Sequence, residues 1–342
     1  MILIRQRRLI FRLALSFGLV GLLMWRINIG EALGIFTEVN YLYVLGALPV
    51  YTLSKLVDAA RWRLMIRPIG NAPVPGLLGT LLIANMTNNV LPVRLGDVMR
   101  VQVPAQRYGL PRASLTATVF VTESLLDGVA FVALTLVGVA LLDVPNLPLD
   151  LVWALMALVA VGLLMAGLVA RLRLSEGWEE RGWMRYVAPK VRETAAGLVP
   201  QFINGLAVLR DSALATQAMV LTLAAWGLEA LMFWLFGLAF GLDLSFSAYL
   251  VIMVAANMIV SMPVVPSNIG PYELATAEVV AVLGVARPLA GAYAIGTHLL
   301  NILWVGVSGL IAMWVMGLSF EDVFSLRQPA PHREVLGESP ES

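Results

Sequence analysis

The sequence has no cysteine and only two histidines among its 342 residues. The absence of cysteine excludes disulfides, thiolate catalysis and thiolate metal sites. One of the two histidines lies in the polar C-terminal tail, so a histidine-rich metal site is not expected. The sequence also lacks a Walker loop, a dinucleotide fingerprint, a nucleophile elbow and an HExxH motif. We therefore expect no metal, no cofactor and no ATP-driven pump.

Charged residues are scarce as well. They make up 13% of the chain, whereas a soluble domain has about 25%. Hydrophobic residues make up 59% of the chain and the mean hydropathy is +0.84. Several apolar runs reach the roughly 18 residues that a membrane-spanning helix needs. The composition therefore predicts an all-α polytopic membrane protein, and the formal net charge of +1 gives no indication of a nucleic-acid partner.

The apolar runs give the positions of the expected helices. They fall near residues 9–25, 41–57, 76–91, 113–142, 149–170, 214–241, 247–262 and 289–317, with a weaker run at 272–286. The first run follows a basic start and precedes no small-residue cleavage site, so we expect a retained helix rather than a removed signal peptide. We expect a transmembrane domain over 1–320. The polar, proline-containing segment 321–342 is expected to be a disordered cytoplasmic tail.

Lysine and arginine indicate the orientation, because short loops rich in them prefer the cytoplasm. The start of the chain, the segment 58–67 and the segment 171–213 are basic, so we assign them to the cytoplasmic side, with 58–67 as a loop. The turn 141–150 carries acidic and no basic residues, which fits the outside. We therefore expect a multi-pass protein of the inner (cytoplasmic) membrane of the cell, with both termini in the cytoplasm.

Polar residues and prolines break two of the apolar runs. The first break is "TNNVLPVRLGDVMR" (87–100). If the run 76–91 crossed the membrane fully, the arginines after it would lie outside, against the charge rule. That run is also marginally short for a crossing. We therefore predict that 76–111 enters from the cytoplasm, breaks and returns to the same side.

The second break, "VSMPVVPSNIGPYELATAEV" (260–279), is related to the first in sequence. Pro92-x-x-x-Gly96 corresponds to Pro266-x-x-x-Gly270, and an acidic residue follows each glycine. A re-entrant segment 247–287 that enters from outside lets the last helix return inward and keeps the charge rule.

The segments after the two breaks also align. In "GLPRASLTATVFVTESLLD" (109–127) and "GVARPLAGAYAIGTHLLN" (284–301), Glu123 corresponds to His298. Together the matches predict an internal duplication with two halves of opposite topology. The halves span about 41–170 and 214–317. Inverted repeats with broken helices at matching positions are typical of alternating-access transporters, whose site lies near the midplane between the repeats.

The breaks predict an internal cavity, because backbone at membrane depth can leave the helix only where protein or water satisfies its polar groups. Helix N-termini in such a cavity favour an anionic head group. Arg94 and Arg100 would add positive charge there; alternatively, they only hold the loop at the cytoplasmic surface.

Glu123 and Asp127 lie four residues apart, on one face of a helix. Counted from Ala113 at about 1.5 Å per residue, they lie roughly 15–21 Å deep, near the bilayer centre. Carboxylates at this depth face water or a partner, for which Arg94, Arg100 and a proton are candidates. The pattern fits either a structural ion pair or a role in binding or gating.

In the second half, His298 lies at a similar depth, and Glu273 follows the break as a loop carboxylate without a basic neighbour in sequence. A lone histidine in a bundle is commonly a packing residue, but the correspondence of His298 to Glu123 favours function. Glu229, in the run 214–241, is a weaker candidate that would pair with another helix. The candidate binding residues are Arg94, Asp97, Arg100, Glu123, Asp127, Asn268, Tyr272, Glu273 and His298.

The stretches "NNVLPVRLGDVMR", "TESLLD" and "PSNIGPYE" resemble the lysylphosphatidylglycerol synthase transmembrane family, also called the flippase-like domain family. The resemblance covers about residues 10–320. Members typically have glutamate at the position of Asp97. They often have arginine at the position of Ser124, so this chain lacks one possible counter-charge for Glu123.

The resemblance implies translocation of a lipid with a charged or sugar-bearing head group, with Arg94 and Arg100 on the phosphate. Glu123, Asp127 and Glu273 would bind a cationic or hydroxylated group or couple to protons. Founding members carry an aminoacyl-transferase domain after the membrane module. Because the chain ends at residue 342, we expect a stand-alone module that does not itself make lysyl-phosphatidylglycerol.

The family also implies the cargo and partners. Phospholipids, polyprenyl-phosphate glycans and hopanoid-type lipids are the expected substrates, and a lipid-modifying synthase is a possible partner. One alternative is an integral-membrane transferase that acts on a lipid carrier and uses Glu123 and Asp127 as a base or metal pair. The other is a membrane scaffold for a lipid-modifying enzyme.

Overall fold

The structure is a computed structural model, and it describes residues 34–90, 95–142, 189–261 and 265–319 together with a few isolated positions before residue 34 and between 142 and 189. Every regular element in these residues is a helix, which confirms the prediction of an all-α fold. The predictions for Arg94, for the first apolar run, for nearly all of the run 149–170 and for the C-terminal tail lie outside the described residues.

The described helices of the first half begin with one long helix and continue with two short ones. The elements are α3 (Tyr41–Ile66), α4 (Val74–Val90), α5 (Leu95–Tyr108), α6 (Arg112–Phe120), the π-helical turn η1 (Val121–Leu126) and α7 (Asp127–Ala140). The last three form one continuous rod, because η1 joins α6 directly to α7.

The second half repeats this order. A helix at one end of the bundle, α9 (Pro189–Gly205), and a 3-10 turn, η4 (Ala207–Arg210), precede it. The long helix is α10 (Ser212–Ala239), the short ones are α11 (Phe246–Ser261) and α12 (Pro271–Val282) with the turn η5 (Pro266–Asn268) between them, and the final long helix is α13 (Arg287–Met316).

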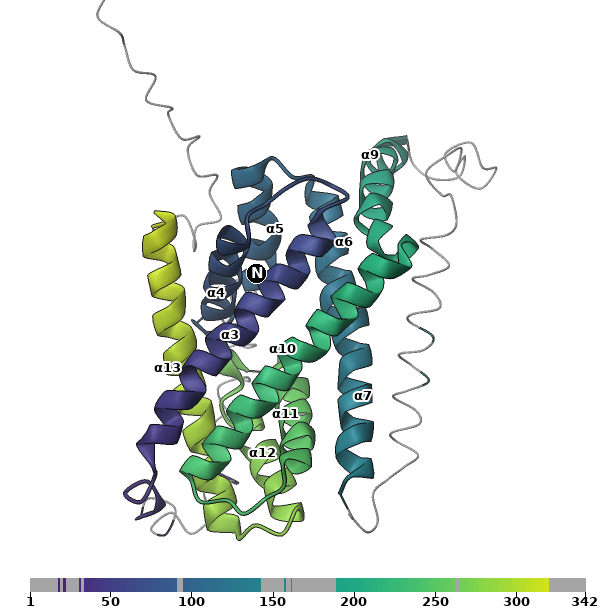
Figure 1. The fold of residues 1–342 in the computed structure, drawn as a ribbon. Helices are drawn as coiled ribbons and strands as arrows, with labels where there is room; N and C mark the ends of the chain where they lie inside the picture. Colours follow the sequence, from purple (N-terminus) through teal and green to yellow (C-terminus); the bar gives the residue numbers. More distant parts are fainter. Residues whose placement is uncertain are drawn as a thin grey trace, which may run out of the picture.

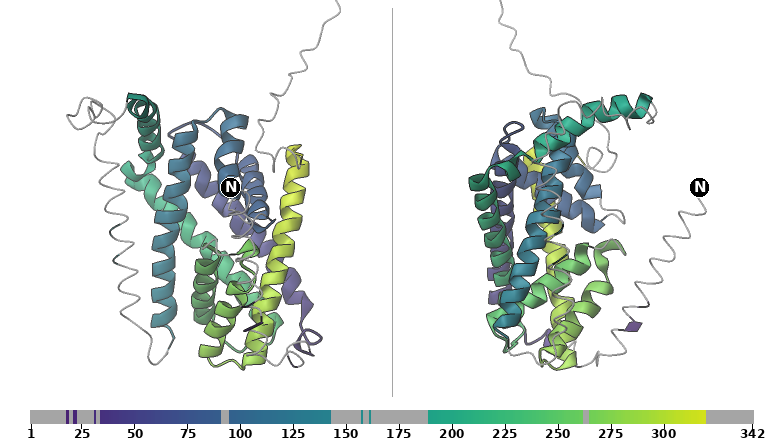
Figure 2. Two further views of the ribbon diagram at one scale, coloured as in Figure 1. Left: turned by 180° about the vertical axis from the view of Figure 1, so that it is seen from behind. Right: turned by 90° about the vertical axis from the view of Figure 1, so that its right-hand side faces the viewer.

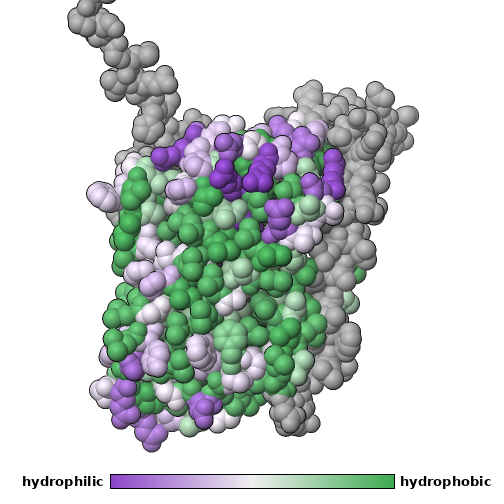
Figure 3. Space-filling view, in the orientation of Figure 1, coloured by the Kyte–Doolittle hydropathy of each residue, from purple (hydrophilic) through white to green (hydrophobic). Residues whose placement is uncertain are grey.

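Four stretches of helix in the described residues are long and apolar enough to cross a membrane. They are α3, the rod α6–η1–α7, α10 and α13, which have 26 to 30 residues each. At about 1.5 Å per residue, each exceeds the roughly 30 Å of the hydrocarbon core. On the face shown in Figure 3, hydrophobic side chains cover the middle and hydrophilic ones gather at both ends. The chain is a multi-pass membrane protein.

One predicted loop is wrong. The segment 58–67 is the last part of α3, which continues to Ile66. No helix-breaking residue follows the apolar run in that segment, and Arg61 is buried rather than in water. Its charge is accommodated by internal carboxylates, described below, so the helix does not need to end where the basic residues begin.

The two pairs of short helices lie in opposite halves of the bundle. In Figure 1, α4 and α5 occupy the upper half and α11 and α12 the lower half, while α3 and α10 run side by side along its diagonal. The tips of the two pairs meet in the middle, where the Ser267 hydroxyl donates a hydrogen bond to the main-chain carbonyl of Asn89. The two breaks in the sequence are therefore neighbours in space.

Local sequence explains the shape of each break. Gly270 has φ = 99°, a conformation that favours glycine. Pro271 then begins α12, where its missing N–H is not needed. In the first break, Gly96 lies against the main-chain carbonyl of Ala84, so that a side chain at this position would collide with the α4 backbone. Glycine is thus required for α4 and α5 to pack closely.

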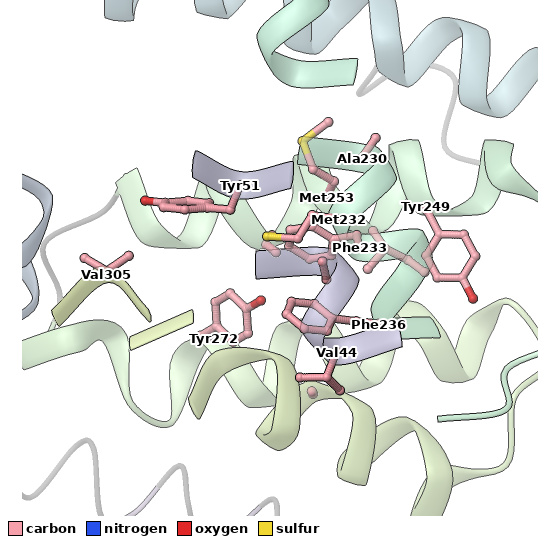
Figure 4. Close-up of a cluster of buried hydrophobic side chains, with 14 of the residues drawn as sticks. Val44, Tyr51, Ala230, Met232, Phe233, Phe236, Tyr249, Met253, Tyr272 and Val305 are labelled. Atoms are coloured by element: carbon pink, nitrogen blue, oxygen red, sulfur yellow. The ribbon is translucent and has the colours of Figure 1, made fainter. Parts of the chain in front are cut away.

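The main hydrophobic core lies between α3, α4 and the helices of the second half. Figure 4 shows Tyr51 of α3, Phe233 of α10 and Tyr272 of α12 among its members. These three side chains also line a polar cavity, so the core supports one wall of the candidate site.

Candidate functional site

A cavity of about 420 Å³ lies between the two pairs of short helices and the long helices around them. Side chains of α3, α4, α5, α6, η1, α7, α10, α11, α12 and α13 line it, together with the second break. The charged residues on its walls are Lys55, Asp58, Arg61, Arg100, Glu123, Asp127 and Glu229. Charges within a bundle of membrane-spanning helices are costly and face an interior partner or water, so the cavity is the candidate functional site.

Three of these charges follow one another along α3. Lys55, Asp58 and Arg61 are spaced three residues apart and therefore lie on one face of the helix. Lys55 Nζ lies 3.1 Å from Asp58 Oδ2, and Arg61 Nη2 lies 3.0 Å from Asp58 Oδ1. Asp58 is thus shared between two cations of its own helix.

The α3 cations also bind carboxylates on other helices. Lys55 Nζ lies 3.2 Å from Glu229 Oε2 on α10. Arg61 Nη1 lies 2.5 Å from Asp127 Oδ1 at the start of α7. The result is a chain of five alternating charges that links α10, α3 and α7 across one side of the cavity.

Neutral donors hold the two ends of this chain of charges. The Asn257 side-chain amide donates to Glu229 Oε1 over 2.9 Å, and the Trp226 indole N–H donates to Asp127 Oδ1 over 2.9 Å. Buried charges are tolerated when ion pairs and hydrogen bonds both satisfy them. Apart from Arg61 Nε, which is buried without a hydrogen-bond partner among the described residues, the five-charge chain meets this condition, and it links α3, α10 and α7.

A second ion pair, Arg100–Glu123, joins α5 to the π-helical turn η1. Arg100 Nη2 also donates to Asn85 Oδ1 over 3.0 Å. The Glu123 side chain is 30% exposed, against 15% or less for the side chains of Asp58, Asp127 and Glu229. Since π-helical turns are frequent at functional sites and Glu123 is the most exposed of these carboxylates, this pair is the one that a ligand reaches most easily.

The second half contributes a hydrogen-bonded pair, Glu273 and His298. His298 Nδ1 lies 2.7 Å from Glu273 Oε1, and the main-chain N–H of Gly270 donates to Glu273 Oε2 over 2.6 Å. The Tyr272 ring stacks on the imidazole with centroids 4.0 Å apart and planes 21° from parallel. His298 and Tyr272 line the cavity, whereas Glu273 lies behind the imidazole.

The structure brings together most of the residues predicted from the sequence. Those that line the cavity are Arg100, Glu123, Asp127, Asn268, Tyr272 and His298. Glu273 does not line the cavity but contacts His298, which does. Asp97 does not line it but accepts a hydrogen bond from the Asn88 side chain in the first break, over 3.1 Å. Whether these residues bind a ligand stays a prediction.

Two predictions need correction, the partner of Asp127 and the position of Glu273. Asp127 pairs with Arg61 of α3 and not with Arg100, because α3 remains helical and brings Arg61 inside. Glu273 is not in a loop but in the first turn of α12, with His298 as its neighbour from another helix. The structure pairs Glu123 with Arg100, one of its predicted partners, and Glu229 with another helix through Lys55, as predicted.

Sequence reasoning missed the α3 charges Lys55, Asp58 and Arg61. A signal was present, because three charges at intervals of three residues mark one face of a helix that is otherwise apolar. The charge rule for loops assigned Arg61 to a loop, and therefore hid this pattern.

Comparisons with known proteins give one family and two relatives. Residues 9–309 match the lysylphosphatidylglycerol synthase TM region. Glycosyltransferase AglD of Haloferax volcanii is 24% identical over 320 residues, a match that covers 84% of this chain and 50% of that protein. A UPF0104 membrane protein of Methanothermobacter thermautotrophicus is 33% identical over 92 residues, which covers 27% of this chain and 28% of that protein. The chain thus spans about half the length of the first relative, and no solved structure matches it.

Proposed function

The chain belongs to the lysylphosphatidylglycerol synthase transmembrane family, and from this membership and its charged cavity we propose that it moves a lipid across the cytoplasmic membrane. The lipid has an anionic, glycosylated or aminoacylated head group, which passes through the cavity while the acyl or prenyl chains stay in the bilayer. The observation that carries the proposal is a cavity with seven charged side chains between two pairs of short helices in opposite halves of the bundle.

The position of the cavity supports a transport path. Short helices that meet at mid-height and end in non-helical backbone are the arrangement that transporters use around a central site. Such backbone is tolerated at membrane depth where it lines a cavity. We infer that α4–α5 and α11–α12 enter the membrane from opposite sides, as an inverted repeat requires. This arrangement gives a head group a site that can be reached from either side in turn.

Arg100 is the group best placed to hold a phosphate. Its guanidinium pairs with Glu123, the most exposed of the cavity carboxylates. A phosphate oxygen pair matches the fork of an arginine as well as a carboxylate does. We infer that the head-group phosphate replaces Glu123 on Arg100, and that Glu123 then faces an ammonium or hydroxyl group of the same head group.

We infer that a lipid head group reaches the cavity beside the end of α11. Val260 and Ser261, at the end of α11, line the cavity and are exposed on the surface. A head group can enter there without its chains leaving the apolar surface. A volume of about 420 Å³ lies within the roughly 300–1,000 Å³ of ligand pockets and suits a head group rather than a whole lipid.

A transferase that acts on a lipid carrier is the second candidate. It is favoured by the similarity to a protein named as a glycosyltransferase, of which this chain covers 50%. In that case Glu123 and Asp127 would face the reacting group, and chemical turnover of the lipid rather than its movement would be the activity. The same similarity keeps glycan-bearing lipids among the substrates, and a lipid-modifying synthase among the partners.

The direct test is flipping by purified protein in liposomes that carry fluorescent phosphatidylglycerol, lysyl-phosphatidylglycerol or a polyprenyl phosphate. We expect protein-dependent exposure of at least one lipid to a membrane-impermeant quencher. Losing hydrogen bonds to a charged partner costs about 1.5–3 kcal/mol, so Arg100→Ala should reduce flipping at least about tenfold at low lipid concentration. Arg100→Lys, which keeps the charge without the fork, should give an intermediate rate.

Arg107→Ala is the matched control. Arg107 is on the same helix, but its guanidinium donates to the main-chain carbonyl of Met316 and does not line the cavity. This variant should flip lipid within about twofold of the wild-type rate, since it removes one peripheral hydrogen bond. No flipping of any lipid by folded protein, together with chemical conversion of a lipid donor, would favour the transferase. Equal loss in Arg100→Ala and Arg107→Ala would remove the cavity from the mechanism.

The basic segments indicate how the chain is oriented. We infer that both termini face the cytoplasm of a cell with this protein in its inner membrane, because the basic start and the basic segment 171–213 favour that side. The chain has no cysteine, so single introduced cysteines and an impermeant thiol reagent report the side of each loop directly. Labelling of a cysteine in 171–213 from the outside of intact cells would contradict this orientation.

A further inference from the structure

The Glu273–His298 pair leaves one edge of the imidazole for the cavity. Glu273 accepts the main-chain N–H of Gly270 and contacts His298 Nδ1. A carboxylate only accepts hydrogen bonds, so Nδ1 is the ring nitrogen that carries the hydrogen. Since His298 lines the cavity and Glu273 does not, the other nitrogen, Nε2, is the one with a lone pair to offer to a ligand in the cavity.

The imidazole is also held in place. The Tyr272 ring stacks on it at 4.0 Å, and only 5% of His298 is exposed. A carboxylate on one ring nitrogen fixes both the tautomer and the orientation of a histidine. The two contacts therefore fix the orientation of the imidazole, and with it the position of Nε2.

The charge balance of the cavity favours an added proton. Among the described residues that line it, four are carboxylates and three are cations. Glu273, behind the imidazole, adds a further acidic group. A net charge is unfavourable away from bulk water. An anionic head group makes the imbalance larger, so its arrival strengthens the attraction for a proton.

From this geometry we infer that His298 is a proton-binding site and that head-group binding is coupled to the uptake of one proton. The inference rests on the proposed function and deepens it. The proton comes from the aqueous solution on the side where the head group enters and adds to His298 Nε2, which gives an imidazolium that donates to Glu273 through Nδ1 and to the head group through Nε2. When the head group leaves on the other side, the proton is released to the solution on that side. Because linkage is reciprocal, a proton on His298 tightens head-group binding by the same factor.

Other ionisable groups contact His298 or share its cavity. Tyr272 and Glu273 of α12 touch the ring. Tyr51 and Lys55 of α3 and Glu229 of α10 share the cavity with it. The cavity residues of α4 and α11 are apolar or carry only amides and hydroxyls. Lys55 and Glu229 are paired with each other. Among the described residues, His298 Nε2 has no such ionic partner.

The test measures the final distribution of lipid between the leaflets under a pH gradient, with the membrane potential clamped by potassium and valinomycin. The lipid is the one that the wild-type protein flips. Coupling to one proton makes each unit of pH difference worth about 1.36 kcal/mol, so the leaflet ratio should depart from equality by up to about tenfold per pH unit. His298→Gln keeps a hydrogen bond to Glu273 but does not titrate. Whatever flipping this variant retains should lead to an even distribution under the gradient.

His332→Gln is the matched control, because it removes the other histidine of the chain and should keep the uneven distribution. Wild-type protein that flips lipid but distributes it evenly under the gradient overturns the proton site and leaves the proposed function intact. Absence of flipping at every pH overturns the proposed function itself. An uneven distribution in His298→Gln shows that the proton binds elsewhere and overturns the assignment.

A second measurement needs no variant. Wild-type protein in weakly buffered detergent is mixed with the same lipid while a pH dye follows the solution near pH 7. We expect about one proton taken up per lipid bound, and no proton change when a lipid that is not flipped is added. Binding without proton uptake would contradict the inference even if His298→Gln failed to fold.

Discussion

Arg61 illustrates, at the scale of single residues, how this bundle keeps charge inside. The guanidinium lies between Asp58 and Asp127 and also donates to the Thr222 hydroxyl over 3.0 Å. Only 4% of the residue is exposed, so the ion pairs replace water almost completely. The arrangement is stable only while each charge keeps its partner.

Replacing Arg61 by methionine should therefore be strongly destabilising. The change keeps an apolar stem but leaves Asp127 without its cation, and breaking a buried ion pair on one side costs about 3–5 kcal/mol. The measurement is unfolding in detergent, by denaturant or heat. The double change Arg61→Met with Asp127→Leu should recover most of the loss, because neither buried charge of that pair then remains.

The control for this prediction is Arg287→Met. Arg287 pairs with Glu278 over 2.8 Å, but its side chain is 52% exposed, and exposed pairs contribute about 0–1 kcal/mol. If Arg61→Met unfolds no more easily than Arg287→Met, the charge chain along α3 does not stabilise the fold.

Some of the charged residues of the candidate site could be predicted from the sequence because each stands in a recognisable local pattern. Glu123 and Asp127 stand out because two acids share a face of an apolar run, and Glu273 because it follows a proline-rich break. Their partners were harder to predict, since an ion pair between helices depends on how the helices pack. The pairing of Asp127 with Arg61 joins positions 66 residues apart, and no local pattern specifies it.

At the scale of elements, the two breaks determine the architecture. Both could be found from sequence because prolines and glycines inside an apolar run commonly kink or end a helix. Gly109 and Gly284 support the correspondence between the halves, since each follows the second short helix of its pair with positive φ, 65° and 94°. The order of long and short helices also agrees between the halves, and their inverted orientation in the membrane stays a prediction.

The observed helix ends differ from the predicted ones where charged residues follow an apolar run. The predicted run 41–57 includes Lys55 but stops before Asp58, whereas α3 continues to Ile66. The π-helical turn η1 was not predicted, since π-helix is rare and occurs mostly as a single turn inside an α-helix. Its effect is specific: it carries Glu123, the side chain that pairs with Arg100.

Gly96 gives a prediction at this scale. In Gly96→Ala the new methyl group would collide with the main-chain carbonyl of Ala84, so α5 must move away from α4. The shift also disturbs the hydrogen bond that the Gly96 N–H donates to Asn88 Oδ1 over 2.8 Å. We expect destabilisation of about 1–3 kcal/mol from overpacking and a clear loss of flipping, measured by thermal unfolding and by the liposome assay.

Gly306→Ala is the matched control, because Gly306 is inside α13 with open space around its added methyl group. Alanine in a helix interior is favoured over glycine by about 0.5–1 kcal/mol, so this variant should be as stable as the wild type or more so. Equal behaviour of the two variants would show that close packing at the first break is not required.

The whole molecule combines long and short helices. Two pairs of short helices approach each other from opposite halves of a bundle, and four long stretches of helix surround them (Figure 2). The charged side chains converge where the pairs meet. Composition alone predicted the membrane and the helices, but the convergence of α3, α5 and α10 on one cavity is a property of tertiary packing.

The central claim is that a lipid head group passes through this cavity, and the most direct test is occupancy of the cavity during transport. Ser124 lines the cavity from η1 and is exposed, and the chain has no cysteine of its own. In Ser124→Cys, a small water-soluble maleimide should label the thiol, the transported lipid should slow that labelling, and labelled protein should stop flipping. Thr116→Cys, at an exposed position outside the cavity, should be labelled at the same rate with and without lipid and should continue to flip. Labelled Ser124→Cys that flips lipid at the wild-type rate would contradict the claim.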